Sequence, residues 1–186
     1  GQLLWDARGL DVTVIAPSPV PLDDGMIFFT AGYGGGSMLL RVGRSGGTFT
    51  SEELGRWPAE EGFSSEQQTP VVLEGRLVGI IPDAGGPRRG QLACWDPATT
   101  TWAWLSGQDR RFGQYGPFLV ADGKLLILDQ DGTLTIAEAS TDAYQPLGSA
   151  KILEGPDAWA PMALVDGRLI ARDTNRMVCL DIRRDR

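Results

Sequence analysis

The sequence predicts an all-β protein built from four repeated units. One observation is a set of glycines that recur at intervals of 50, 48 and 44 residues: Gly25, Gly75, Gly123 and Gly167. A second is a set of prolines ahead of them, at intervals of 51, 47 and 44 residues: Pro19, Pro70, Pro117 and Pro161. Because two residue types recur together, whole units repeat, and units of this length are typical of repeat folds. No segment shows a convincing helical pattern, so the units are expected to consist of strands.

Each unit reads as four short strands in a fixed order. An apolar strand ends at an Asp-Gly or Glu-Gly pair, which favours a tight hairpin turn, and a second apolar strand follows. Second strands are expected at 76–81 and 124–128, third strands at 37–42, 91–96, 133–138 and 176–181, and a clear fourth strand at 101–105. Four antiparallel strands per unit are typical of a β-propeller blade.

The predicted organisation is therefore one β-propeller domain over residues 1–186. It would hold four four-stranded antiparallel blades at about 15–57, 66–105, 114–147 and 158–186. Residues 1–8 are expected to serve as the closing outer strand of another blade.

The glycine-rich stretch at 32–36 could be a phosphate-binding loop or a turn between strands. A dinucleotide-binding loop needs a third glycine and a following helix, but Ser37 stands in the glycine position and the apolar run after it stops at Gly43. In the alignment of the four units, 32–36 falls between the second and third strands. We therefore expect a blade hairpin that happens to be rich in glycine.

Composition excludes several classes of function. The chain has 186 residues, 24 acidic and 17 basic side chains, and a net charge of −7. Nucleic acid and anionic membranes are therefore unsuitable partners. No apolar run is long enough to span a membrane as a helix. Histidine is absent, which removes the commonest general base and metal ligand. Since the chain starts at Gly1 without Met, its natural start is expected to have been removed.

Residues around Cys94 carry a family resemblance. The sequence resembles the A-x-D-x-x-T-G-x-x-x-W docking motif of quinoprotein-type propellers at Cys94-x-Asp96-x-x-Thr99-Thr100-x-x-x-Trp104. Residues 136–142 keep part of the same motif. The chain is thus similar to PQQ-like (quinoprotein-type, BamB-like) β-propeller repeat proteins over nearly its whole length. The resemblance implies that Trp104 packs between neighbouring blades while Asp96 and Thr99 tie the turn together. It also implies an extracytoplasmic (periplasmic or secreted) location.

The two ends of the chain fit two parts of that motif. Gly1-Gln-Leu-Leu-Trp5 matches its tail, and Cys179-x-Asp181 matches its head. The resemblance implies a ring of seven or eight blades, and three arrangements remain open. The chain is the C-terminal half of a longer propeller, or half of a two-chain ring, or a closed four-bladed monomer. In the two-chain ring, a homodimer, residues 1–7 would complete the partner's last blade at 176–182 by strand exchange.

The chemistry of the sequence favours binding over catalysis. Quinoprotein dehydrogenases hold PQQ beneath an adjacent cysteine pair, with calcium, but Cys94 and Cys179 occupy the same repeat position two units apart. Both are expected to be small buried residues on third strands. Glu60-Glu61 and 109–111 are expected to be solvated loop charges. No catalytic residue, metal ligand or cofactor is predicted. The alternative is part of a PQQ-dependent dehydrogenase, with calcium, whose active site lies mostly outside this chain.

The connections that enter each blade are the predicted binding surface. Polar and aromatic residues there would ring one mouth of the central channel: Asp11, Thr13, Tyr33, Gln67, Gln68, Gln114, Tyr115 and Trp159. Such groups suit a protein, a peptide or a carbohydrate, whereas the alternative is that they only cap and solvate loop ends. The function predicted from sequence is a non-enzymatic binding or scaffold module.

Overall fold

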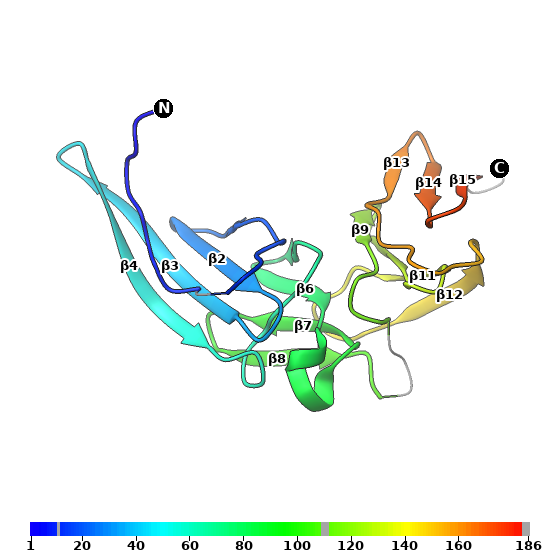
Figure 1. The fold of residues 1–186 in the computed structure, drawn as a ribbon, viewed down its shortest axis with the longest axis horizontal. Helices are drawn as coiled ribbons and strands as arrows, with labels where there is room; N and C mark the ends of the chain where they lie inside the picture. Colours follow the sequence, from blue (N-terminus) through cyan, green and yellow to red (C-terminus); the bar gives the residue numbers. More distant parts are fainter. Residues whose placement is uncertain (11, 109–111, 184–186) are drawn as a thin grey trace.

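The computed structural model describes residues 1–10, 12–108 and 112–183, and it is almost entirely β. Four antiparallel sheets follow one another along an open arc, with the N-terminal segment and the last sheet at opposite ends (Figure 1). Within each sheet the strands pair in chain order. This confirms the prediction of an all-β propeller segment whose repeated unit is an antiparallel blade.

In the described part of the chain, the first three blades have four strands each and the last has three. Blade 1 consists of β1 (Val20–Pro21), β2 (Met26–Ala31), β3 (Gly36–Ser45) and β4 (Thr48–Trp57). Blade 2 consists of β5 (Val71–Leu73), β6 (Arg76–Ile80), β7 (Leu92–Asp96) and β8 (Thr101–Leu105). Blade 3 consists of β9 (Phe118–Ala121), β10 (Lys124–Leu128), β11 (Thr133–Glu138) and β12 (Pro146–Lys151). Blade 4 consists of β13 (Ala163–Val165), β14 (Arg168–Arg172) and β15 (Met177–Asp181).

The first hairpin of every blade turns at the predicted Asp-Gly or Glu-Gly pair. In blade 2, Glu74 has φ 49° and Gly75 has φ 79°, and the other three pairs also have two positive φ angles. Two successive residues in this region define a type I′ turn, whose twist matches that of the flanking strands. The repeating glycines therefore mark one conformation that is used four times.

The hydrophobic core lies between blades, where the face of one sheet packs on the next. A row of paired residues crosses each sheet: Val20, Phe28, Leu39 and Gly55 in blade 1; Val71, Val78, Cys94 and Trp104 in blade 2; Leu119, Leu126, Ile136 and Gly148 in blade 3. We call these sets the register rows. In each, the non-glycine residues pack toward the following blade.

A β-bulge recurs at one place in the first three blades. It lies between Leu39 and Leu40, between Cys94 and Trp95, and between Ile136 and Ala137. Each bulge directly follows the third-strand residue of the register row. Since a bulge increases local twist, the repetition keeps the outer strand of each blade in the same orientation.

Three features differ from the sequence-based expectations. A short 3-10 helix, Asp83–Arg88, occupies the connection between β6 and β7, where only a turn was expected. Cys94 is buried as predicted, but the prediction was wrong for Cys179, which is exposed because no other sheet of the described residues packs on its face of blade 4. Residues 1–10 form no strand within the described chain, so the pairing of 1–8 with another blade stays a prediction.

Candidate binding site at the channel mouth

Three connections between blades meet at one face of the molecule. They are residues 58–70, 106–117 and 152–162, each running from the outer part of one blade to the first strand of the next. The Gln68 side-chain amide donates to the carbonyl oxygen of Tyr115 at 3.1 Å and to that of Trp159 at 3.2 Å. One side chain thus links the entrances to blades 2, 3 and 4. We use the name mouth cluster for Gln68, Gln114, Tyr115 and Trp159 together with Tyr33.

Two aromatic rings lie together in the mouth cluster. The ring centroids of Tyr115 and Trp159 are 4.6 Å apart at an interplanar angle of 54°. Gln114 donates to the Tyr115 hydroxyl at 2.8 Å and accepts from the backbone N–H of Asp83 at 3.1 Å. Both polar atoms of the Gln114 amide are therefore engaged, and the side chain fixes the phenol that the second aromatic ring contacts.

Glu66 is a buried carboxylate beneath this surface. Only 5% of the residue is exposed, and one carboxylate oxygen lies 3.5 Å from the backbone nitrogen of Tyr33. The glutamate reaches this position because it crosses Gly32, where an added Cβ would lie 2.2 Å from Cγ of Glu66. The glycine-rich hairpin is therefore shaped for a close approach by the neighbouring connection.

Acidic surroundings affect the phenol of Tyr115. Burial raises its pKa, and the negative charge of Glu66 together with a hydrogen bond to that carboxylate raises it further. Tyr33 and Asp83 act in the same direction. A raised phenol pKa favours the protonated form, so at neutral pH Tyr115 remains an O–H donor.

Tyr33 and Trp159 are the exposed aromatic members of the cluster. Tyr33 is 63% exposed and has a φ of 53°, so the turn holds it outward, and Trp159 is 40% exposed. The structure therefore brings together five of the residues that the sequence placed at the mouth: Tyr33, Gln68, Gln114, Tyr115 and Trp159.

Three other predicted mouth residues do not join this network. Thr13 and Gln67 are exposed, and within the described chain neither is seen to bond to the cluster. Asp11 lies outside the described residues. Conversely, sequence reasoning missed Glu66, although it stands beside Gln67 in the connection already chosen as a mouth element. An alignment of the connections would have added Glu66 to the candidate residues. Its burial, however, depends on contact with another blade.

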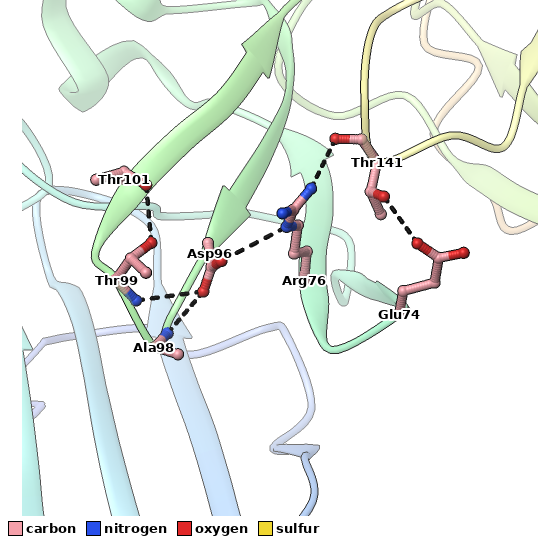
Figure 2. A network of polar contacts seen from close by, with 7 residues as sticks. All are labelled: Glu74, Arg76, Asp96, Ala98, Thr99, Thr101 and Thr141. Atoms are coloured by element: carbon pink, nitrogen blue, oxygen red, sulfur yellow. Dashed lines mark hydrogen bonds and ion pairs between the residues drawn. The ribbon is translucent and has the colours of Figure 1, made fainter.

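The motif around Cys94 lies on a different part of blade 2, and Figure 2 shows its Asp96 and Thr99 beside Arg76, which reaches Thr141 of blade 3. Asp96 accepts from the backbone N–H groups of Ala98 and Thr99 at 2.9 and 3.3 Å, and the Thr99 hydroxyl lies 2.8 Å from that of Thr101. These bonds close the turn between β7 and β8. They are the local contacts expected of an Asx turn.

Two side chains of the β5–β6 hairpin, Glu74 and Arg76, contact blade 3. Arg76 lies 3.5 Å from the Asp96 carboxylate and donates to the carbonyl oxygen of Thr141 at 2.9 Å. The Thr141 hydroxyl donates to Glu74 at 2.8 Å (Figure 2). Trp104, which is 8% exposed, donates from its indole nitrogen to the carbonyl oxygen of Ser140 at 3.0 Å. Blades 2 and 3 are thus joined by polar bonds around an apolar interface.

The remaining motif residues lie at the two ends of the arc. Trp5 is half-buried beside blade 1. Asp181 at the end of β15 pairs with Arg183, and hydrogen bonds from Arg183 lower the pKa of the Asp181 carboxyl to about 2. Neither residue is seen to contact another blade in the way that Trp104 and Arg76 do, so their docking roles stay predictions.

The described residues do not fit a quinone and calcium site. Cys94 and Cys179 lie on β7 and β15, two blades apart, and only Cys179 is exposed. Burial raises the pKa of the Cys94 thiol to about 11, so this thiol remains protonated at neutral pH. No group of three His, Cys, Asp or Glu side chains suited to a metal ion occurs among the residues the structure describes.

Comparison with known proteins identifies the fold. No protein-family model and no curated protein sequence matches the chain. The structure is similar to that of BamB from Moraxella catarrhalis, with a TM-score of 0.58, 15% identity, and coverage of 89% of this chain and 43% of that one. It also matches the computationally designed Ika4 protein, with a TM-score of 0.58, 12% identity, and coverage of 96% and 99%.

A second designed protein, Ika8, has a TM-score of 0.54 and 13% identity, with coverage of 81% of this chain and 41% of that one. The chain therefore spans about two fifths of BamB and of Ika8, and nearly all of Ika4. At these identities the similarity shows the β-propeller fold alone. In the described part of the chain, no helix is long and apolar enough to cross a membrane.

Proposed function

We propose that this propeller segment is a non-enzymatic binding module that holds a peptide segment of a partner protein at the mouth cluster. The observation that supports this most strongly is the linkage made by Gln68, which fixes three connections together while leaving Tyr33 and Trp159 exposed. A rigid polar base under exposed aromatic side chains is typical of a recognition surface, because little ordering is needed on binding.

The chemistry of the cluster defines what the peptide should contain. Tyr33, Tyr115 and Trp159 offer aromatic faces, and the amides of the two glutamines bond beside them. Glu66 and Asp83 add negative charge at the same place. An extended peptide that presents an apolar or cationic side chain to the aromatic faces would fit this surface. A carbohydrate, the other ligand class that suits these groups, is one outcome of the test.

Selection from a peptide display library and a parallel glycan array test this proposal. We expect peptides whose binding falls at least fivefold in Tyr33→Ala, because aromatic anchors contribute about 1–2 kcal/mol or more at such sites. Thr48→Ala, at the far tip of the β3–β4 hairpin, is the matched surface control. Selected peptides that bind Tyr33→Ala as well as the native chain, or binding to glycans alone, would contradict it.

We further propose that two copies of the chain close one ring, with residues 1–7 of each completing the last blade of the other. The support is that, among the described residues, blade 4 has three strands where the other blades have four. Light scattering should then give about 40 kDa, twice the 20.0 kDa of one chain. Deletion of residues 1–7 should return the mass to that of one chain, and a dimer that survives the deletion would refute strand exchange.

The proposed location is extracytoplasmic, periplasmic or secreted, and it is supported by the resemblance to PQQ-like repeat proteins. The expected result is that, in a bacterial host producing the chain from its natural gene, the protein fractionates with periplasmic or secreted markers. Recovery with cytoplasmic markers alone would contradict this placement.

A further inference from the structure

A cavity of about 460 Å³ lies between the first hairpins of blades 1 and 2. Because the connections of the mouth cluster enter the first strands at their other ends, this cavity lies on the opposite face of the molecule. Blade 1 lines it with apolar side chains that are partly or fully buried: Leu22, Met26 and Leu39. The β5–β6 hairpin and the β7–β8 turn of blade 2, with Thr141 and Asp142 of blade 3, form the rest of the wall. The cavity thus has an apolar floor and a polar rim.

The next interface along the chain shows which group the repeat places at this position. Between blades 2 and 3, the Arg76 guanidinium lies 3.5 Å from the Asp96 carboxylate and donates to the Thr141 carbonyl oxygen at 2.9 Å (Figure 2). The Thr141 hydroxyl donates to Glu74 at 2.8 Å. A guanidinium and a carboxylate from the hairpin of one blade therefore bind the turn of the following blade.

Between blades 1 and 2 no such bridge is seen among the described residues. By the register rows, Met26 stands where Arg76 stands, and Asp23 stands where Glu74 stands. The thioether of Met26 has no N–H group to donate to the facing turn of blade 2, so the carboxylate is kept in the hairpin without the guanidinium. The cavity therefore lies where an arginine would close the interface.

The rim of the cavity is negatively charged. Four carboxylates line it, and Arg76 is the one basic side chain among the described residues that do so: the carboxylates belong to Asp23, Glu74, Asp96 and Asp142. Glu74 and Asp96 are engaged in the bridge to blade 3. In the described chain, no hydrogen bond or ion pair is seen for the carboxylates of Asp23 and Asp142. These two groups are left as acceptors for a cation from outside.

We propose that this cavity binds a guanidinium group on an aliphatic stem, the chemistry of an arginine side chain, as Arg76 is bound between blades 2 and 3. The planar guanidinium presents several N–H donors in a fixed geometry that suits carboxylates, whereas an ammonium group is a point charge. The methylene stem would cover Leu22 and Met26, which are only partly buried in the free chain. The site is separate from the mouth cluster and goes beyond the function proposed for it.

An NMR titration followed at the methionine methyl groups tests this proposal. The first probe is a capped pentapeptide of four glycines around one arginine, and its control replaces the arginine by citrulline, which has nearly the same shape without the charge. We expect the arginine peptide to bind about tenfold more tightly than the citrulline peptide, because charge-assisted hydrogen bonds are lost in the control. The lysine peptide should bind less tightly than the arginine peptide.

The same titration locates the site and distinguishes two sources of the guanidinium. The methyl signal of Met26 should shift, whereas Met38, Met162 and Met177, which do not line the cavity, should keep their positions. Agmatine carries the same group as a free small molecule. Binding of agmatine as tight as that of the peptide would support a small-molecule ligand, and binding of the peptide alone would support an arginine of a partner protein.

Two matched variants separate the cavity from general attraction to an acidic chain. Asp23→Asn and Asp24→Asn each remove one exposed carboxylate from the same turn, but only Asp23 lines the cavity. Asp23→Asn should weaken the arginine peptide about fivefold or more, and Asp24→Asn should leave its affinity unchanged. Ala98→Trp should also abolish binding, since the larger side chain would occupy the cavity without removing a carboxylate.

Three results would overturn the proposal: equal affinities for the arginine and citrulline peptides, no shift of the Met26 methyl signal at saturation, or equal effects of Asp23→Asn and Asp24→Asn. The last would mean that the net charge of −7 attracts the peptide without a defined seat. Tyr33→Ala alters the mouth cluster and should leave this titration unchanged, so failure of one site is distinguishable from failure of the other.

Discussion

Trp104 shows how a single side chain can join two blades. Its ring belongs to the apolar cluster between blades 2 and 3, and its indole N–H donates to the Ser140 carbonyl oxygen at 3.0 Å. The resemblance of the sequence motif implied that this residue packs between neighbouring blades, and Trp104 lies between blades 2 and 3. What the motif does not contain is the acceptor, because Ser140 belongs to another blade.

Replacing Trp104 by Phe should therefore lower the free energy of unfolding by more than the change in ring size alone. The variant leaves the Ser140 carbonyl without its donor, at a cost of about 1–3 kcal/mol. Urea denaturation followed by circular dichroism measures the change. Trp102→Phe makes the same substitution on the same strand, and an equal loss in the two variants would contradict the role of the hydrogen bond.

The two cysteines should differ in reactivity. Burial raises the pKa of Cys94 to about 11, so below that pH the thiol is protonated and a poor nucleophile. In native protein at pH 8, a thiol reagent should therefore modify at most one cysteine per chain, and in urea it should modify both. Rapid modification of Cys94 in the native state, located by mass spectrometry, would contradict its burial.

Gly32 is a residue whose role depends on a neighbour far along the chain. Gly32→Ala should destabilise the protein and weaken peptide binding, because the added Cβ would lie 2.2 Å from Glu66 and displace the buried carboxylate. We expect a loss of about 1–3 kcal/mol, measured by urea denaturation, as is typical of overpacking. Gly148→Ala is the control, since nothing lies within 4 Å of its added Cβ. Equal stability of the two variants would show that Glu66 moves away freely.

At the scale of elements, the repeated hairpin was the feature that the sequence predicted best. The strands expected at 101–105, 124–128 and 133–138 match β8, β10 and β11 residue for residue. Local patterns suffice there, because an alternating or continuous apolar run bounded by turn residues defines a short strand. The innermost strand of blade 1 is only Val20–Pro21, where proline limits pairing, and such shortening is harder to anticipate.

Other elements depended on contacts between blades. The 3-10 helix Asp83–Arg88 has no periodic pattern, and its backbone N–H at Asp83 donates to the Gln114 side chain of the next connection. The mouth cluster could be placed on the right connections from the sequence, since these precede the first strands. The contacts among the members of the mouth cluster could not be predicted, because Gln68 donates to two carbonyl oxygens that lie 47 and 91 residues away along the chain.

The type I′ turns provide a test at this scale. Gly75 has a φ of 79°, and an added Cβ would meet nothing within 4 Å, so Gly75→Ala isolates the cost of the backbone conformation. We expect a loss of about 1–2 kcal/mol. Gly148→Ala is equally free of contacts and has no positive φ, and should be close to neutral in chemical denaturation. A neutral Gly75→Ala would mean that the hairpin can adopt another turn.

At the scale of the whole molecule, the sheets form a linear series in which each blade packs on its neighbours. Three apolar clusters lie between successive blades, and blade 4 contributes one face to the last of them. Stability in such arrays is largely a sum of unit and interface terms, so blades with one neighbour are the less protected. Blades 2 and 3, packed on both faces, should be the most stable part of the chain.

Hydrogen exchange measured by mass spectrometry should show this order. We expect the slowest exchange in β6, β7 and β10 and the fastest among core strands in β14 and β15, because the free face of blade 4 is open to solvent. Protection of β15 should rise with protein concentration if a second copy adds a strand there. Uniform protection across the four blades would contradict the linear series.

The open end of the arc also bears on whether the association of copies of this chain ends in a closed ring. An edge of one copy that pairs with the opposite end of the next is a head-to-tail contact, and such contacts give either a ring or an endless fibre, depending on the rotation between subunits. The curvature of the arc, which arises from its four twisted sheets, sets that rotation. A substitution that flattened the arc, for example by removing the recurrent bulge beside Cys94, would therefore be expected to turn a discrete particle into a filament, visible by electron microscopy.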